Sequence, residues 1–233
     1  MSRGGAHGIF ECTDGLEDLC LADMFKKGTK VPLTTRFSTV GGESGSPDAH
    51  RDPRGFSVKF KTSEGNWDFV ANNTPVFFLR DPAKFPVFIH TQKRDPQTHL
   101  NGDTDSTNFW DYLSQNPESI HQTMILFGDR GIPFGWRFMH GYYGHTLKLV
   151  NKNGEWVYVQ FHLISDQGTK NLTAEEAAEV SPDHSTKDLF DAIEKGDFPS
   201  WTMKVQTMNE EEAKKLWEEK KVSEYRVEVD GML

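Results

Sequence analysis

Residues 31–40 read VPLTTRFSTV and residues 55–62 read GFSVKFKT, and these two stretches decide the fold. In the first stretch one face carries Leu33, Thr35 and Phe37, and the other carries Thr34, Arg36, Ser38 and Val40. In the second stretch polar residues separate Phe56, Val58 and Phe60. Alternation with a period of two predicts half-buried strands, because successive side chains of a strand point to opposite faces.

More extended stretches follow along the chain. They are Trp67–Asn72, Pro75–Leu79, Thr146–Val150, Trp156–Ile164 and Trp201–Met208. We expect Pro75–Leu79 to pair with Trp67–Asn72 or to continue it as one bent strand. The turn 151–154, which reads NKNG, predicts a hairpin between two of the later strands.

Helical spacing occupies much of the remainder. The predicted helices cover Phe109–Leu113, Pro117–Leu126, a segment from Thr173 to about Glu179, a segment from Ser185 to Gly196, and 210–221. Glu176 lies three residues after Thr173, as in a capping box. In the segment from Ser185 we expect Leu189, Phe190 and Ile193 to point inward.

Strands that come mostly before helices predict an α+β fold with an antiparallel sheet or barrel. We expect residues 1–208 to form a β-barrel core with inserted helices. Residues 209–233 would then form a C-terminal helix and a closing strand at Tyr225–Val229.

The composition restricts the class of protein. The 233 residues include 17 Phe and 6 Trp, which suits a β-rich core or a large apolar ligand site. A net charge of −9 argues against a nucleic-acid partner. No apolar run reaches the ~18 residues of a membrane span. Residues 1–8 lack the apolar core of a secretory signal. Cys12 and Cys20 form no metal-ligand pattern, which is typical of reduced intracellular thiols.

A ligand pocket can be inferred from the residues alone. Arg36 and Ser38 share one strand face, and Asn72 is followed closely by the phenylalanines Phe77, Phe78 and Phe85. Such a pocket would take a flat apolar ligand with an anionic edge that meets Arg36. The alternative is that residues 72–75, which read NNTP, form an ordinary turn. The nine histidines form no metal set.

A series of motifs then resembles the haem catalases, in order, over roughly residues 8 to 212. The motifs are RFSTV (36–40), ESGS (43–46), RDPRGF (51–56), GNWD (65–68), NNTPVFF (72–78), QKR (92–94), PQTH (96–99), DRGIP (129–133), HTLKLVN (145–151), DQG (166–168) and FPSWT (198–202). The resemblance implies an eight-stranded antiparallel β-barrel with flanking helices that holds haem b.

The resemblance also implies roles for single residues. Asn72 matches the distal asparagine that positions peroxide, and Ser38 matches the serine that hydrogen-bonds the distal histidine. Arg36 matches the arginine that pairs with a haem propionate, and Val40 matches the residue that narrows the peroxide channel. Phe77, Phe78 and Phe85 match the distal aromatic wall, and His145 matches a histidine of the proximal hydrogen-bond network.

Two blocks of the family pattern have no counterpart in the 233 residues. The catalytic histidine of the family precedes a Phe-Glu pair, here Phe10-Glu11, by about twelve residues, which would place it before Met1. The block Arg-x-Phe-x-Tyr-x-Asp, whose tyrosine is the axial iron ligand, is absent, and the surroundings of Tyr225 do not match it. No metal ligand is therefore expected in this chain.

Some members of the family bind NADPH. His121 and Arg130 fit that site, whereas Gly128, His140 and Ile164 stand where those members carry Ser, Asn and Lys. Because loss of a cation weakens phosphate recognition, NADPH binding by this chain is not favoured.

The resemblance implies disproportionation of hydrogen peroxide to water and dioxygen, with this chain's activity reduced because both blocks are missing. An alternative is an inactive remnant that binds a ligand or a partner subunit. A third interpretation, a lipocalin-like carrier, gains no support from the charged face with Lys59 and Lys61. Assembly of several copies of this chain into a homo-oligomer is compatible with the sequence. We expect an intracellular location, in the peroxisome or cytoplasm, although residues 231–233 (GML) are not a peroxisomal signal of the Ser-Lys-Leu type.

Overall fold

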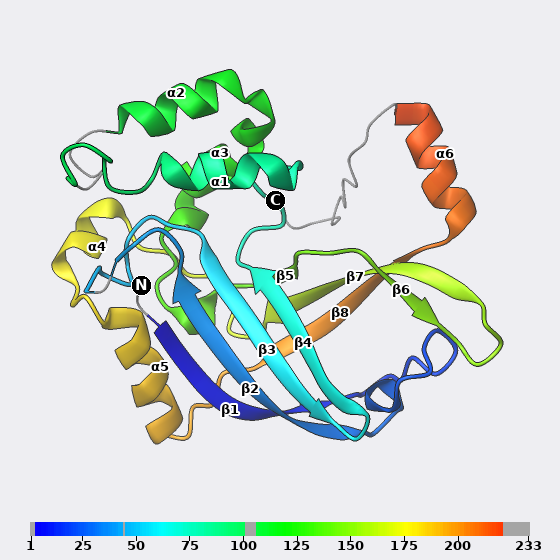
Figure 1. The fold of residues 1–233 in the computed structure, drawn as a ribbon. Coiled ribbons are helices and arrows are strands. Elements are labelled where there is room, and N and C mark those ends of the chain that lie inside the picture. Colours follow the sequence, from blue (N-terminus) through cyan, green and yellow to red (C-terminus); the bar gives the residue numbers. More distant parts are fainter. Residues whose placement is uncertain (1–2, 44, 101–105, 221–233) are drawn as a thin grey trace.

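A computed structural model describes residues 3–43, 45–100 and 106–220 (Figure 1). The strands are β1 (Arg3–Glu11), β2 (Lys30–Thr39), β3 (Arg54–Thr62), β4 (Gly65–Asn72), β5 (Gly141–Tyr143), β6 (Leu147–Val150), β7 (Trp156–Ser165) and β8 (Trp201–Met208). The α-helices are α1 (Phe85–His90), α2 (Thr107–Gln115), α3 (Ile120–Phe127), α4 (Ala174–Glu179), α5 (His184–Glu194) and α6 (Glu210–Lys220). Short 3₁₀ turns include η4 (Pro117–Ser119) and η6 (Trp136–Phe138).

The eight strands form one curled antiparallel sheet. β1 to β4 pair in sequence, β4 pairs with β5, and both β5 and β6 pair with one edge of β7. β8 pairs with the other edge of β7 along its whole length. Within the described residues no ladder joins β1 to β8, so the sheet is a half-barrel with a seam. The predicted α+β fold with an eight-stranded antiparallel sheet and flanking helices is confirmed.

Aromatic side chains fill the concave side of the sheet. Phe37, Phe56, Phe60, Phe69 and Phe161 are all buried there. The Trp201 ring of β8 lies 5.7 Å from the Phe37 ring and 5.3 Å from the Phe56 ring, centroid to centroid. Side chains of β8 therefore reach those of β2 and β3 across the interior, and burial of these rings stabilises the curl.

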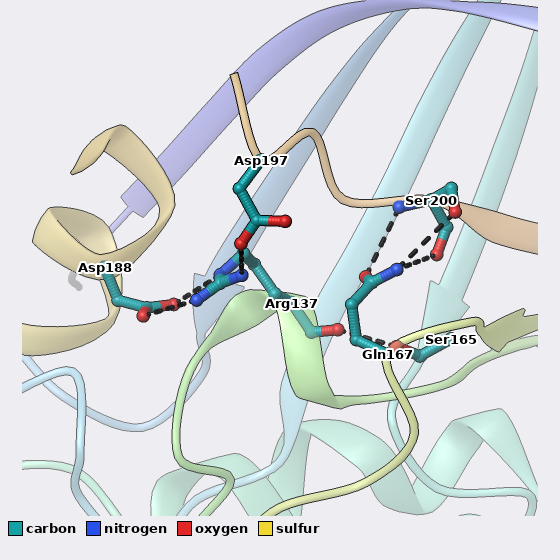
Figure 2. A network of polar contacts seen from close by, with 6 residues as sticks. All are labelled: Arg137, Ser165, Gln167, Asp188, Asp197 and Ser200. Carbon is teal, nitrogen blue, oxygen red and sulfur yellow. Dashed lines mark hydrogen bonds and ion pairs between the residues drawn. The ribbon is translucent and has the colours of Figure 1, made fainter. Parts of the chain in front are cut away.

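The seam is bridged by η6 and α5. The Trp136 ring stacks on Phe37 at 6.0 Å and lies against β1, because a Cβ on Gly4 would come within 2.7 Å of Trp136 Nε1. Arg137 donates two hydrogen bonds of 2.9 Å to the Asp188 carboxylate on α5 and one of 3.1 Å to Asp197 (Figure 2). Side chains thus close the seam where backbone pairing does not.

The helices α1, α2 and α3 form a layer beyond one end of the sheet (Figure 1). Their common core consists of Phe78, Phe88, Leu113 and Leu126. The prediction of a strand at Pro75–Leu79 is wrong, because this segment leaves the sheet. Phe78 is only 3% exposed in the helical core, and its carbonyl accepts a 2.8 Å hydrogen bond from Ser119 Oγ.

The helix predicted from Ser185 is α5, and its N-terminus is capped from far along the chain. Asp48, which is fully buried, accepts the N–H groups of Ser185 and Thr186 at 3.0 Å each. Leu189 is buried as predicted, but Phe190 is 63% exposed, so its predicted inward orientation is wrong. Gly196 adopts a φ of 77° after the helix, which a glycine tolerates at a C-terminus.

The predicted capping box of α4 is present: the Thr173 side chain accepts from the Glu176 N–H, and the Glu176 carboxylate accepts from the Thr173 N–H. The helix predicted at 210–221 corresponds to α6. The strand expected at Tyr225–Val229 lies outside the described residues. Among the described helices none has the length and apolar character that crossing a bilayer requires.

Candidate functional site

Ser38, Gly55 and Asn72 form a row across three neighbouring strands. Ser38 of β2 pairs with Gly55 of β3, and Gly55 pairs with Asn72 of β4. The alternate residues of these strands, among them Phe37 and Phe56, fill the concave core, so the row lies on the convex face of the sheet. Two strand spacings separate Ser38 from Asn72, which corresponds to about 10 Å between their backbones.

Three polar side chains on this face have no partner within the described part of the chain. The Ser38 hydroxyl, the Asn72 amide and the Arg36 guanidinium make no hydrogen bond or ion pair with another described residue. Ser38 is nevertheless only 6% exposed, and Asn72 is half-buried. Polar groups that have no protein partner among the described residues are available to a ligand.

Hydrogen bonds hold the backbone around the row in place. Beyond Ser38, the N–H groups of Val40 and Gly41 both donate to the Asp52 carboxylate. Burial raises the pKa of Asp52, although these two hydrogen bonds act in the opposite direction. Beside Asn72, Asn73 Oδ1 accepts the Arg54 N–H at 2.8 Å. The ends of β2, β3 and β4 are therefore held in a fixed register around Gly55.

Arg54 lies at the centre of this hydrogen-bonded backbone. Its side chain is 1% exposed and donates to the carbonyl oxygens of Asp48, His50 and Asp52. Burial lowers the pKa of Arg54 to about 10, which leaves the guanidinium charged at neutral pH. The structural roles of Asp52, Arg54 and Asn73 were missed from the sequence. The sequence feature that could have indicated these roles is the charged motif at 51–55, which lies between the apolar alternations of β2 and β3.

The three phenylalanines predicted for the site have different environments. Phe77 and Phe85 are 43% and 40% exposed, and their ring centroids lie 6.0 Å apart. Phe78 packs 4.5 Å from Phe88 in the helical core and is buried. The structure therefore leaves two of these rings accessible and uses the third to anchor the loop after β4.

Val40 and His145 lie at the margins. Val40 follows the end of β2 and is 36% exposed. His145 follows β5, is exposed, and has its ring 5.9 Å from the ring of Tyr143. No side-chain hydrogen bond or ring contact among the described residues joins His145 to the Ser38–Asn72 row, but the preceding Gly144 donates its N–H to the Val70 carbonyl oxygen of β4 at 3.2 Å. The structure thus brings Arg36, Ser38 and Asn72 onto one face and places the His145 backbone next to β4.

A pocket lies beside η6 and is lined by Asn73, Arg130, Pro133, Phe138, Met139, His140, Thr169 and Asn171. His140 Nδ1 accepts the Ser165 N–H at 3.0 Å, so this nitrogen carries no proton. Burial, and then the charge of Arg130, holds the pKa of His140 below its ordinary value of 6.5. A neutral imidazole therefore lines this pocket.

Comparison with known proteins agrees with the fold. The sequence pattern of the family described as Catalase matches residues 2–221. The chain is 60% identical over 216 residues to a catalase of Schizosaccharomyces pombe. The match covers 91% of this chain and 42% of that protein. The chain is 58% identical over 218 residues to peroxisomal catalase A of Saccharomyces cerevisiae, again with 91% and 42% coverage.

Solved catalase structures share the fold of this chain. Catalase A from Saccharomyces cerevisiae superposes with a TM-score of 0.87 at 57% identity, over 91% of this chain and 44% of that one. A bacterial catalase superposes with a TM-score of 0.87 at 46% identity, over 91% and 41%. The chain thus spans about two-fifths of the length of the relatives it matches. With a family match over nearly all of its residues, the chain belongs to the catalase family.

Proposed function

We propose that the convex face of β2, β3 and β4 binds haem and takes part in the decomposition of hydrogen peroxide to water and dioxygen. The observation that carries this proposal is the set of partnerless polar groups on Arg36, Ser38 and Asn72, next to apolar side chains that stay uncovered. On the same face Val70 is 59% exposed beside this set. Phe77 follows in the next loop, and Phe85 begins α1.

The residues present fit one side of a haem. Haem has two broad apolar faces and an edge with two carboxylates, so it needs apolar contact and a cation at the rim. Val70, Phe77 and Phe85 offer the apolar contact, and the free guanidinium of Arg36 would pair with a propionate. Val40, at the end of β2, would narrow the approach to this face, and Phe78 would support the loop from beneath.

Bound haem supplies the iron at which the O–O bond of peroxide is cleaved. The Asn72 amide N–H would donate a hydrogen bond to a peroxide oxygen and so orient it. The Ser38 hydroxyl would both donate and accept beside it. An amide does not titrate near neutral pH and is a poor carrier of protons, so we expect slow peroxide turnover by these residues alone.

Residues around this face, and the relatives of the chain, suggest further parts of the proposed function. We infer that His145 belongs to the hydrogen-bond network on the opposite side of the haem. We infer weak or no NADPH binding, because His140 and Ile164 replace groups that would contact the dinucleotide. Relatives of this chain include proteins named peroxisomal catalases, and we infer a peroxisomal or cytoplasmic site of action and assembly into a homo-oligomer.

The proposal can be tested by titrating the purified chain with haemin. We expect a Soret band that saturates at one haem per chain. Arg36→Ala should weaken haemin binding about tenfold, because a charge-assisted pair is lost. Lys61→Ala is the matched control, since it removes a positive charge at the far end of β3 and should leave the affinity unchanged.

An oxygen electrode then separates two functions. Oxygen release from peroxide by the haem-loaded chain would support catalase chemistry in this polypeptide. Saturable haemin binding without oxygen release would instead favour a haem-binding barrel that has no turnover of its own. Haemin binding that is weak, non-stoichiometric and equal in the Arg36→Ala variant would contradict the proposed site.

A further inference from the structure

An ion pair joins the segment that follows β2 to the helical layer. Glu43 lies in that segment and accepts two hydrogen bonds from the Arg94 guanidinium, from Nε at 2.9 Å and from Nη2 at 2.8 Å. Arg94 follows α1, so the pair crosses from the sheet to the helices. An arginine and a carboxylate joined by two parallel bonds fix each other's orientation as well as attract each other.

Arg94 belongs to a loop that is held in one conformation. Its Nη1 donates to the His99 carbonyl oxygen at 2.9 Å, and the Asp95 carboxylate accepts two backbone N–H groups of the same loop. Among the described residues other than glycine, only His99 has a positive φ, of 57°. A residue in this conformation is strained and persists where its surroundings hold it. The loop therefore keeps the guanidinium directed toward Glu43.

A second connection between the same parts is built differently. Arg51, which precedes β3, is half-buried and donates to the carbonyl oxygens of Leu126 and Gly128 at the end of α3. The side chains of Glu43 and Arg94 are 53% and 36% exposed. Exposed ion pairs contribute little to stability and weaken as salt is added. Of the two connections, the Glu43–Arg94 pair is therefore the one that opens more easily.

The end of the convex face lies close to this pair along the chain. The Ser38–Gly55–Asn72 row lies where β2, β3 and β4 approach the helical layer (Figure 1). Ser38 is only 6% exposed, whereas Arg36, the preceding residue of β2 on this face, is exposed. This end of the face is therefore covered, and a molecule from solvent reaches Ser38 only when the covering segments leave room. The segment that carries Glu43 continues from this end of β2.

We propose that the Glu43–Arg94 pair is a latch between the end of β2 and the helical layer, and that it limits the size of the molecules that reach the covered end of the convex face. With the latch closed, molecules of the size of peroxide pass and larger organic molecules are held back. The inference rests on the proposed function, in which this face holds the haem. Neither residue contacts a ligand, and both act by holding two segments together.

The test uses a thiol as a reporter and needs no haem. In a chain with Cys12→Ala and Cys20→Ala, the substitution Ser38→Cys places one thiol at the covered end of the face. Its reaction with methyl methanethiosulfonate, a small neutral reagent, is compared with its reaction with dithiodipyridine, a larger neutral aromatic reagent. The ratio of the two rates measures selection by size, because a change in the reactivity of the thiol itself affects both reagents.

Glu43→Ala should raise the rate of the larger reagent about fivefold relative to the smaller one, because the latch is lost. Arg94→Gln should have the same effect, and the double variant should show no more than either, since both substitutions remove one contact. Added salt should raise the ratio in the parent chain and leave it unchanged in Glu43→Ala. Glu118→Gln is the matched control, since it removes an exposed ion pair, to Lys84 at 2.6 Å, whose partners both belong to the helical layer.

A ratio that stays the same in Glu43→Ala, that rises equally in Glu118→Gln, or that rises additively in the double variant would overturn the latch. A rise confined to the larger reagent in Glu43→Ala and Arg94→Gln would support it. If the Ser38→Cys chain does not fold, Asn72→Cys in the same row serves as the reporter. Haemin titration of the unlabelled chain is independent: its failure would overturn the proposed function, while the two rates still decide whether the latch exists.

Discussion

Asn73 and Arg54 are tied to each other twice: Asn73 Oδ1 accepts the Arg54 N–H at 2.8 Å, and the Asn73 N–H donates to the Arg54 carbonyl oxygen at 3.0 Å. Asn72, the preceding residue, makes no side-chain hydrogen bond to another described residue. Two adjacent asparagines therefore have opposite roles. One locks β3 to β4, and the other keeps its amide available on the convex face.

We predict that Asn73→Ala lowers the free energy of unfolding by about 1–3 kcal/mol, because the buried Arg54 N–H loses its acceptor. Asn72→Ala should change it by less than about 0.5 kcal/mol, as expected for a side chain without partners. Urea unfolding followed by circular dichroism measures both. Equal losses in the two variants would contradict the division of roles.

The cap of α5 leads to a second prediction. Asp48→Ala removes a buried carboxylate that accepts the N–H groups of Ser185 and Thr186, and we expect a loss of about 2–3 kcal/mol. Thr173→Ala removes the exposed cap of α4 and should cost about 1 kcal/mol. Thermal unfolding of both variants tests the contrast. A cost for Asp48→Ala no larger than that for Thr173→Ala would show that burial adds nothing to this cap.

Much of the fold could be predicted because the deciding stretches have a strong period. The strands β2, β3, β7 and β8 were predicted within a residue or two of their observed bounds. The strands β1 and β5 were missed: β1 is rich in glycine and shows little apolar alternation, and β5 has only three residues, too few to show a period. Pro75–Leu79 was mistaken for a strand because its apolar residues pack into the helical core, and a run of apolar residues does not reveal which core it joins.

The candidate site divides in a similar way. The alternation of β2 was enough to put Arg36 and Ser38 on one face, and the observed register adds Asn72 to that face. That Gly55 lies between Ser38 and Asn72 was not predicted, because the alternation within one strand does not give its pairing register with the next strand. Nor could it reveal that Asp48 caps α5, since 137 residues separate Asp48 from Ser185.

A third prediction concerns the seam. Arg137 and Asp188 are 13% and 15% exposed and form a two-bond pair. Arg137→Ala should lower the free energy of unfolding by about 2–4 kcal/mol, because Asp188 would be left partly buried without its partner. Arg137→Lys should recover only part of this loss, because a single ammonium cannot reproduce both bonds.

The exposed pair Lys187–Asp191 on the same helix is the control for this prediction. Lys187→Ala should cost less than about 0.5 kcal/mol, as is usual for surface ion pairs. Urea unfolding compares the three variants. If Arg137→Ala were as mild as Lys187→Ala, the bridge between η6 and α5 would not stabilise the seam.

The last prediction is a pH dependence that arises from His140. Burial and the nearby Arg130 lower its pKa in the folded state, so below pH 6.5 the unfolded state binds more protons at this residue than the folded state does. Its stabilising contribution is therefore complete above pH 6.5 and is lost as the pH falls through the folded-state pKa. His162, whose pKa is also lowered by burial, adds a loss in the same direction.

Between pH 7.5 and 5.5 the wild-type chain should thus lose stability, and His140→Gln should reduce that loss by up to about 1 kcal/mol. His121, which is exposed on α3, provides the control variant His121→Gln. Urea unfolding at the two pH values gives the difference for each protein. Protonation of His140 would break the hydrogen bond from the Ser165 N–H, since Nδ1 could then no longer accept it. A pH dependence that is the same in all three proteins would mean that this bond survives acidification, and that His140 is not held neutral by the fold.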